Sequence, residues 1–231
     1  EIRQAASAFL EMRERIERHM DQQTEMLAGV SHDLRTPLTR IKLELTMLRE
    51  TYKDADKEIK DIEIDILEME KMIDEYLSFA RGQGREEPVS TNIVSVLKKV
   101  AEDAKRKNAM VELEGNLDEI ILPLRLNAIN RCLTNLVDNA IHFGDKVKIY
   151  ALLDLNFVEV FIEDNGPGIP VESMSDVFKP FFRLDNARNP NIGGAGLGLA
   201  IARDVARAHG GDIILRRSSM GGLCVILRLP V

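Results

Sequence analysis

The stretch GQGREEP, residues 82–88, divides the 231-residue chain into two parts with different sequence patterns. Its two glycines and one proline favour a turn over a helix or a strand, so the stretch predicts a linker. Apolar residues before it recur at helical spacing, whereas the residues after it alternate between strand-like and helix-like runs. The sequence therefore predicts two domains of different fold.

The N-terminal part carries apolar residues at alternating steps of three and four residues. The first run extends from Ile2 to Val30 and includes the polar residues His19 and Gln23. Buried polar residues can set the register of a coiled coil, and a locally frayed stretch accounts for them equally well. Two further runs, over residues 34–48 and 59–80, flank a polar segment and predict a helical hairpin.

This hairpin is too narrow to bury both of its apolar runs alone. Pairing two hairpins into a four-helix bundle would bury them, so the sequence predicts a homodimer.

Composition and charge exclude several classes of protein. With 45% hydrophobic and 30% charged residues, the chain is typical of a soluble protein that can bury a core. A formal net charge of −7 argues against a nucleic-acid-binding surface. Cys132 and Cys224 lie far apart without a CxxC motif, which indicates buried thiols and neither a disulfide framework nor a zinc site. No apolar run reaches the roughly 20 residues that cross a bilayer.

The C-terminal part predicts a two-layer α+β domain, because strands and helices are mixed along it. The patterns predict helices over residues 91–107, 126–143 and 197–208, and strands over residues 111–113, 147–153, 158–164, 212–217 and 223–229.

The first motif of this domain is NLVDNAIHF, residues 135–143. Asn135 and Asn139 are four residues apart and so share one face of the predicted helix. An amide offers an oxygen to a metal ion and N–H donors to phosphate oxygens. By itself, the motif is equally well read as two solvated amides on an amphipathic helix.

Two glycine-containing motifs follow. In DNGPG, residues 164–168, the carboxylate of Asp164 ends a strand, and Gly166 and Gly168 allow a ligand to approach the backbone closely. In GGAGLGLA, residues 193–200, a glycine-rich loop leads into a helix whose free N–H groups and dipole favour an anion. Taken singly, the first is an ordinary turn and the second a flexible loop before a capped helix.

Together, the three motifs resemble the N, G1 and G2 boxes of the GHKL ATPases, and Phe178, Phe181 and Phe182 resemble an F box. With VSHDLRTPL at residues 30–38, nearly the whole chain resembles a bacterial sensor histidine kinase. The stretch AGVSHDLRTPLTRI is similar to the osmosensing kinases that partner OmpR-type regulators.

This resemblance implies an α+β chain in which a helical-hairpin dimerisation domain precedes a two-layer α/β sandwich that binds ATP. It implies a signalling helix at the end of a HAMP-like linker (1–26), a dimerisation and phosphotransfer hairpin (27–83), a linker (84–89) and a catalytic ATP-binding domain (90–231). It also implies that this piece is the soluble, cytoplasmic portion of a longer protein anchored in the bacterial inner membrane.

The resemblance further implies an ATP and Mg²⁺ site. Asp164 would accept a hydrogen bond from the adenine amino group, Asn135 would hold Mg²⁺, and Asn139 would orient the metal and the phosphates. The other residues that it implies for ATP binding are His142, Phe143, Gly166, Gly168, Arg183, Arg188, Gly194, Gly196, Gly198 and Leu199.

Two positions depart from the family pattern. His142 stands where a lysine or arginine is common, and a neutral imidazole gives a weaker, pH-dependent phosphate contact. A structural histidine on the helix surface is an equal alternative. Ala195 replaces a frequent Ser or Thr, which removes one hydroxyl contact.

His32 precedes the apolar Leu34 by two positions, and about 200° of helical rotation predicts that it is exposed. Asp33 can hold the proton on one ring nitrogen and so sharpen the lone pair on the other. Thr36 lies four residues after His32 on the same face, and the resemblance implies that its hydroxyl orients water for dephosphorylating a response regulator.

The sequence thus predicts Mg-ATP-dependent autophosphorylation of His32, transfer to an aspartate of a response-regulator receiver domain of OmpR type, and dephosphorylation of that regulator. Two alternatives remain. One is a GHKL ATPase without phosphotransfer, which the predicted exposed His–Asp pair opposes. The other is a noncatalytic dimeric scaffold, which Asn139, Asp164 and the glycine loops oppose.

Overall fold

The chain forms two compact units, Glu1–Gly84 and Arg85–Val231, and their boundary falls within the predicted linker. The computed structural model describes residues 11, 12, 15, 34–49, 59, 60, 62–64, 66, 67, 69, 70, 73, 86–107, 109–115, 119–184 and 196–231. The predictions for seven residues lie outside this described part, namely those for His19, Gln23, His32, Asp33, Arg188, Gly194 and Ala195.

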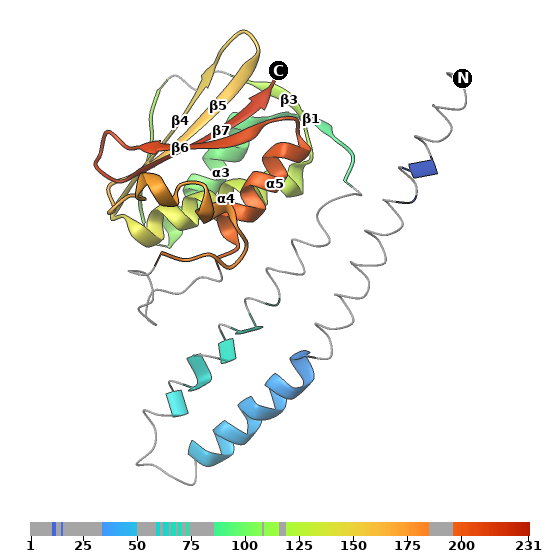
Figure 1. Cartoon of the computed structure of the whole chain (residues 1–231), viewed down its shortest axis with the longest axis vertical. Coiled ribbons are helices and arrows are strands. Elements are labelled where there is room, and N and C mark those ends of the chain that lie inside the picture. Colours follow the sequence, from blue (N-terminus) through green and yellow to red (C-terminus); the bar gives the residue numbers. More distant parts are fainter. Residues whose placement is uncertain are drawn as a thin grey trace. The chain divides into compact units, whose positions relative to one another are not determined.

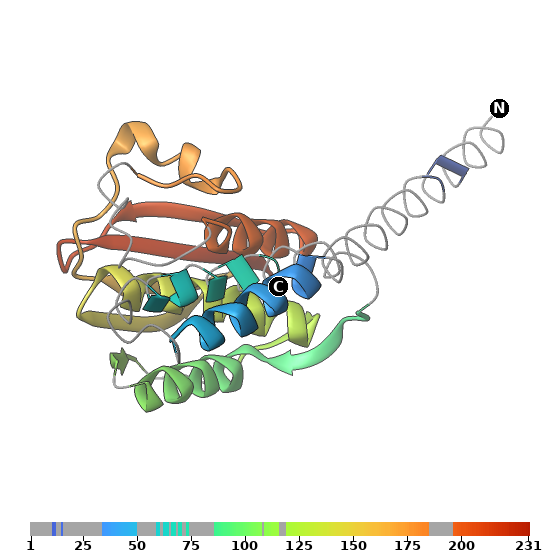
Figure 2. The same ribbon diagram turned by 90° about the horizontal axis from the view of Figure 1, so that it is seen from below.

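The first unit contains a helix over residues 34–49, drawn in blue in Figures 1 and 2, and the described residues between 59 and 73 are also helical. Leu45, Ile59 and Ile66 form a small buried cluster, against which Leu38 packs. Two ion pairs join the two segments with the register of an antiparallel hairpin, Lys42 to Glu70 at 3.2 Å and Arg49 to Glu63 at 3.5 Å.

The second unit is a mixed α+β domain, as the sequence predicts. In chain order its elements are β1 (Val89–Asn92), α3 (Ile93–Arg106), β2 (Met110–Leu113), β3 (Ile121–Leu124), α4 (Leu126–Phe143), β4 (Lys146–Leu153), β5 (Phe157–Asp164), the 3-10 turns η2 (Val171–Ser173) and η3 (Asp176–Phe178), α5 (Gly198–Ala208), β6 (Asp212–Arg217) and β7 (Leu223–Pro230).

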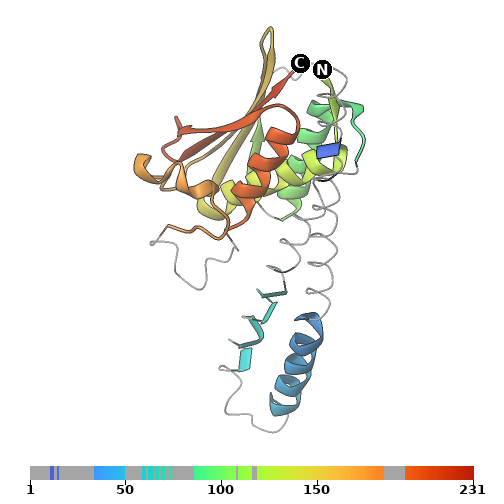
Figure 3. The ribbon, with the colours of Figure 1, turned by 45° about the vertical axis from the view of Figure 1, so that its right-hand side comes forward.

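A five-stranded sheet with the order β2-β4-β5-β7-β6 forms one layer of this domain. Only the pairing of β2 with β4 is parallel; the other three pairings are antiparallel. Helices α3, α4 and α5 form the second layer and cover one face of the sheet (Figures 1 and 3). The predicted two-layer sandwich is therefore confirmed.

The core lies between the two layers. Ile149, Ile162 and Val225 face one another across β4, β5 and β7 and are buried. Cys132 and Cys224 are free thiols and are buried, as predicted. Helix α4 contributes seven buried side chains at helical spacing, namely Ala128, Ile129, Cys132, Leu133, Leu136, Val137 and Ala140.

The structure corrects the start of the first predicted helix of this domain. Thr91 pairs with Leu122 in the two-stranded ladder of β1 and β3, so the helix begins only at Ile93. The side chain of Asn92 accepts a hydrogen bond from the N–H of Val94 at 3.1 Å and caps the helix.

Strands β1 and β3 are not predicted from the sequence. Each has only four residues, and β3 contains Pro123, which lacks a backbone donor and argues against a strand. Pairing with β1 nevertheless accommodates Pro123, which lies opposite Ser90.

Residues 171–184, orange in Figure 2, follow β5 and contain the two 3-10 turns. Across the described residues, none of the helices combines the length and the apolar character needed to span a bilayer.

Candidate functional site

Asp164 ends β5 and is the most buried charged side chain of the described residues, with 2% of its surface exposed. Its Oδ1 accepts hydrogen bonds from the N–H of Gly166 at 2.8 Å and from the N–H of Leu223 at 3.1 Å. Burial raises the pKa of this carboxyl above its ordinary value, more than the two backbone hydrogen bonds lower it. Within the described residues, both hydrogen bonds end on Oδ1, so Oδ2 is the oxygen that can accept from a ligand.

Glycines enclose this carboxylate. A Cβ on Gly222 would overlap Oδ1 of Asp164, and a Cβ on Gly166 would overlap the carbonyl oxygen of Phe143. On Gly144 it would lie only 3.0 Å from the Cβ of Asp164. The end of β5, the start of β7 and the end of α4 therefore approach one another more closely than side chains would permit.

Gly222 and Gly144 were not among the predicted site residues. The glycine pair at residues 221–222, between two strand patterns, is a turn signal that could have pointed to the first. Nothing local in the sequence indicates that this turn packs on Asp164.

Asn135 and Asn139 both lie on α4, four residues apart, and both are half-buried. A Cβ placed on Gly198 would be 3.9 Å from the Cβ of Asn135. The first residue of α5 therefore lies beside Asn135. That distance is an ordinary van der Waals contact, so the fold leaves room for a side chain at Gly198.

His142 and Phe143 are exposed at the end of α4, with their ring centroids 4.7 Å apart in an edge-on arrangement. The carbonyl of Phe143 lies against Gly166, so this helix end borders the Asp164 loop. From Asn135 to Phe143, α4 rises about 12 Å. The helix thus connects two parts of the site, the Asp164 carboxylate at its C-terminal end and the start of α5 near its middle.

The start of α5 has the features of an anion-binding helix end. Its N-cap residue, Leu197, provides no side-chain hydrogen bond. In the described part of the chain, no side chain accepts from the N–H groups of Gly198, Leu199 or Ala200. These groups and the helix dipole can therefore bind an anion such as a phosphate.

Phe181 and Gly196 meet just before the start of α5. The N–H of Phe181 donates to the carbonyl of Gly196 at 3.0 Å. Both residues have left-handed backbones, with φ values of 64° and 70°. A Cβ on Gly196 would lie 2.9 Å from the carbonyl oxygen of Phe182, so glycine is required there. Arg183, two residues after Phe181, is exposed.

Gly168 and Thr36 complete the predicted residues that can be placed. Gly168 has a φ of 74°, which explains its glycine. Thr36 is exposed on the helix over residues 34–49. Asn165, between Asp164 and Gly166, is structural, since its Oδ1 accepts from the N–H of Lys146 at 2.9 Å.

The described residues contain no cluster of three His, Cys, Asp or Glu side chains placed to hold a metal ion. A metal at this site would instead find amide oxygens on α4 and, with a nucleotide, phosphate oxygens. These are hard ligands of the kind that Mg²⁺ prefers.

Comparison with known proteins identifies two families along the chain. Residues 125–231 match the HATPase_c family of histidine kinase-, DNA gyrase B- and HSP90-like ATPases. Residues 22–85 match HisKA, the His Kinase A (phospho-acceptor) domain.

Individual relatives agree with these matches. The sensor histidine kinase GtrS of Pseudomonas aeruginosa is 33% identical over 230 residues, which are 100% of this chain and 46% of that protein. The sensor histidine kinase CpxA of Escherichia coli is 32% identical over 234 residues, covering 98% of this chain and 51% of that protein. The chain thus spans about half the length of these relatives.

A solved structure agrees as well. The ATP binding domain of PrrB from Mycobacterium tuberculosis is similar at a TM-score of 0.53 and 29% identity, covering 63% of this chain and 97% of that domain.

Proposed function

This chain belongs to the sensor histidine kinases of bacterial two-component systems, and from that membership we propose that it transfers the γ-phosphoryl group of ATP to His32. The single observation that carries the proposal is the buried Asp164, whose Oδ1 is held by two backbone N–H groups while Oδ2 is left for a ligand. An acceptor in that position suits the amino group of adenine.

The geometry of α4 supports the placement of the nucleotide. With the adenine base at Asp164 and beside Phe143, the phosphates would lie toward Asn135 and toward the first N–H groups of α5, which no side chain caps within the described residues. Asn135 would hold Mg²⁺, which supplies charge neutralisation on the phosphates when bound, and Asn139 would orient the metal and the phosphates. The phosphate oxygens would be contacted by the side-chain N–H groups of the two asparagines. Further contacts would come from Arg183, Arg188, Gly194 and Gly196.

The chemical step joins a ring nitrogen of His32 to the γ-phosphorus and breaks the bond from that phosphorus to the bridging oxygen of ADP. Asp33 holds the proton on the other ring nitrogen, so the attacking lone pair stays available. Most of the rate enhancement comes from positioning and electrostatic stabilisation, as in other phosphoryl transfers.

The phosphoryl group then passes from His32 to an aspartate of a response-regulator receiver domain, for which we propose the OmpR type. Thr36 is an exposed residue, and its hydroxyl would orient the water that later hydrolyses the regulator's aspartyl phosphate.

A homodimer is part of the proposal. Leu34, Ile41 and Leu48 are spaced seven residues apart and each is more than 40% exposed in the single chain. They form a second apolar stripe on the helix, apart from Leu38 and Leu45, which pack inside the hairpin. A heptad stripe of this kind is buried when two hairpins form a four-helix bundle. We further propose that the full-length protein is anchored in the inner membrane with this portion in the cytoplasm.

The proposal is tested by incubating the purified chain with Mg²⁺ and ATP labelled at the γ-phosphate. Wild type should acquire label that is labile in acid and stable in base, as expected for phosphohistidine. His32→Gln should lose the label and keep its nucleotide affinity, whereas the control His19→Gln should remain labelled.

Label retained in His32→Gln would contradict the assignment of His32. Phosphate release without labelling of wild type would favour a GHKL ATPase, and no nucleotide binding at all would favour a scaffold.

A further inference from the structure

Arg203 of α5 contacts the segment that leads into the loop before that helix. Its guanidinium carbon lies 4.2 Å from the ring centroid of Phe178, the last residue of η3. A guanidinium over an aromatic face at this distance is a favourable cation–π contact.

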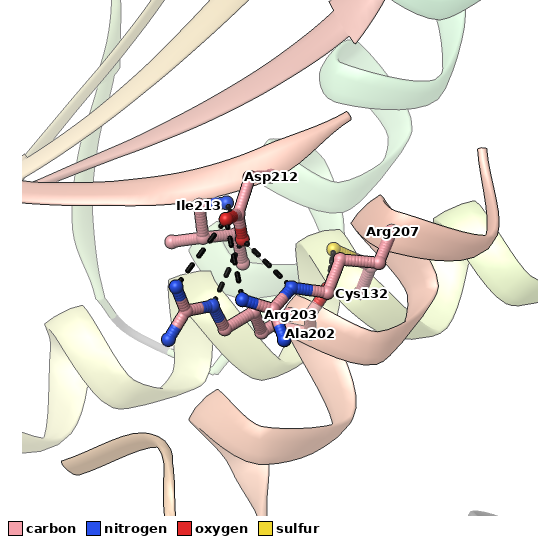
Figure 4. Close-up of polar contacts among 6 residues, drawn as sticks. All are labelled: Cys132, Ala202, Arg203, Arg207, Asp212 and Ile213. Atoms are coloured by element: carbon pink, nitrogen blue, oxygen red, sulfur yellow. Dashed lines mark hydrogen bonds and ion pairs between the residues drawn. The ribbon is translucent and has the colours of Figure 1, made fainter. Parts of the chain in front are cut away.

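Asp212, the first residue of β6, holds Arg203 in this orientation. Its Oδ1 accepts from Nε of Arg203 at 2.8 Å and its Oδ2 from a terminal nitrogen of Arg203 at 3.3 Å (Figure 4). Two such bonds fix the plane of the guanidinium. Arg207 also reaches Asp212, at 3.4 Å, but within the described residues only Arg203 stacks on Phe178.

The ring of Phe178 borders open space as well as Arg203. A pocket of about 260 Å³ lies beside it, so close packing on that side does not hold the ring. The pocket is lined by residues of the η3 segment and of α5, namely Ser175, Phe178, Lys179, Pro180, Ala200, Arg203, Asp204 and Arg207.

Phe178 lies three residues before Phe181, whose N–H donates to the carbonyl of Gly196. A left-handed backbone is unfavourable for phenylalanine, so the surrounding structure must hold Phe181 in place. Gly196 directly precedes Leu197 and α5. The described residues on both sides of residues 185–195 are therefore attached to α5, Gly196 along the chain and Phe178 through Arg203.

We propose that Arg203 is a positioning residue for nucleotide binding, which fixes Phe178 and through it the closure of Phe181 on Gly196, beside Arg183. The inference rests on the proposed function, because Arg183 and Gly196 are among its proposed phosphate contacts. When Phe181 and its neighbours can adopt other arrangements, only a fraction of the molecules is ready to bind ATP, and the apparent affinity for ATP falls with that fraction.

The test compares four variants of the full chain by calorimetry with Mg-ATP. Arg203→Lys keeps the charge but loses the flat, bidentate group, and Phe178→Leu removes the ring. Each should weaken binding by about threefold to tenfold, the scale of one cation–π contact. The double variant should bind no more weakly than Phe178→Leu alone, whereas the control Arg207→Lys should stay within about twofold of wild type.

Amide hydrogen exchange without nucleotide provides an independent readout. The N–H of Phe181 should lose protection in Arg203→Lys and keep it in Arg207→Lys. Wild-type affinity in Arg203→Lys, an equal loss in Arg207→Lys, multiplying losses in the double variant, or unchanged Phe181 protection would each overturn the inference. Failure of wild type to bind Mg-ATP would instead contradict the proposed function, and the exchange experiment would still decide the role of Arg203.

Discussion

At the scale of single residues, the two neighbouring carboxylates on β5, Glu163 and Asp164, have side-chain pKa values shifted in opposite directions. Glu163 accepts hydrogen bonds from Tyr150 at 2.8 Å, from Ser218 at 2.7 Å, and from the backbone and hydroxyl of Ser219. Burial raises its pKa, but these hydrogen bonds outweigh burial and hold the pKa below its usual value. Asp164 receives two bonds on one oxygen only, and its pKa is raised. Glu163 is thus structural, whereas Asp164 keeps an oxygen for a ligand.

Asp164→Asn should weaken ATP binding by at least about tenfold while the fold is retained. Because Gly166 and Leu223 donate to the Oδ1 position, the new amide will place its oxygen there and turn its NH₂ group toward the base. A donor then faces the adenine amino group. GTP, whose base carries an oxygen at that position, should lose less affinity than ATP. Calorimetry with both nucleotides checks this, with Asp138→Asn on the exposed face of α4 as the control; equal losses for both would argue against this orientation.

Gly198→Ala separates a structural role from a ligand role. The space around Gly198 accepts a Cβ, so thermal stability should stay within a few degrees of wild type. If phosphates approach the free N–H groups there, ATP affinity should still fall by about tenfold. The melting temperature and the ATP affinity, measured on the same sample, test these two expectations. Unchanged ATP affinity would place the phosphates elsewhere.

At the scale of elements, the start of α4 is stabilised by residues distant in sequence. Glu86, within the predicted linker, accepts from the N–H of Asn127 at 2.7 Å and of Ala128 at 3.1 Å. The Nε2 of His209, beyond the end of α5, accepts from the N–H of Arg125 at 3.0 Å. These contacts satisfy N–H groups that a helix leaves unpaired and place a negative charge at its positive end.

Glu86→Ala should therefore lower the free energy of unfolding of the second unit by about 1 kcal/mol, the usual cost of losing a helix cap. Glu87→Ala is the matched control, because Glu87 is exposed and makes no such contact within the described residues. Denaturant unfolding of both variants measures the difference. Similar losses in the two would mean that the cap contributes nothing.

The junction of α5 and β6 predicts a pH dependence. Hydrogen bonds from Arg203 lower the pKa of Asp212 to about 2. A carboxyl with a depressed folded-state pKa stabilises the fold above its unfolded value of about 3.9, and this contribution disappears as the pH falls toward 2. Asp212→Asn should thus be less stable than wild type at pH 6, by about 1 kcal/mol or less for a partly exposed pair. In chemical unfolding, the difference in stability between Asp212→Asn and wild type should disappear between pH 4 and about pH 2. A difference that stays constant over this range would exclude the ion pair as its cause.

At the scale of the whole molecule, the two units carry separate parts of the proposed activity. The first contains the proposed phosphoacceptor and the apolar stripe, and the second contains the residues proposed for ATP. Changes in one unit should therefore leave the other function intact.

Ile41→Glu should dissociate the proposed dimer, because it places a charge in the middle of the stripe of Leu34, Ile41 and Leu48. ATP affinity should change by less than about twofold, since the site lies in the other unit. Leu43→Glu, also exposed but outside the stripe, serves as the control. Sedimentation and calorimetry distinguish the outcomes: a dimer that survives Ile41→Glu would exclude this stripe as the interface.

The sequence by itself determined the elements whose patterns are local. Helix α4 and strand β6 have the predicted bounds, because an amphipathic helix of this length and a strand between turn residues are recognisable from their own residues. The same holds for Asp164 as a candidate, since a carboxylate before two glycines is a local motif.

Only the tertiary structure decided the contacts that surround these elements. Gly222 packs on Asp164, Glu86 caps α4, and Arg203 stacks on Phe178, each across tens of residues of chain. Strands β1 and β3 likewise exist through their mutual pairing, despite Pro123. A periodic pattern reports which face of an element is apolar, but not which distant residue meets it, because that depends on how the layers pack.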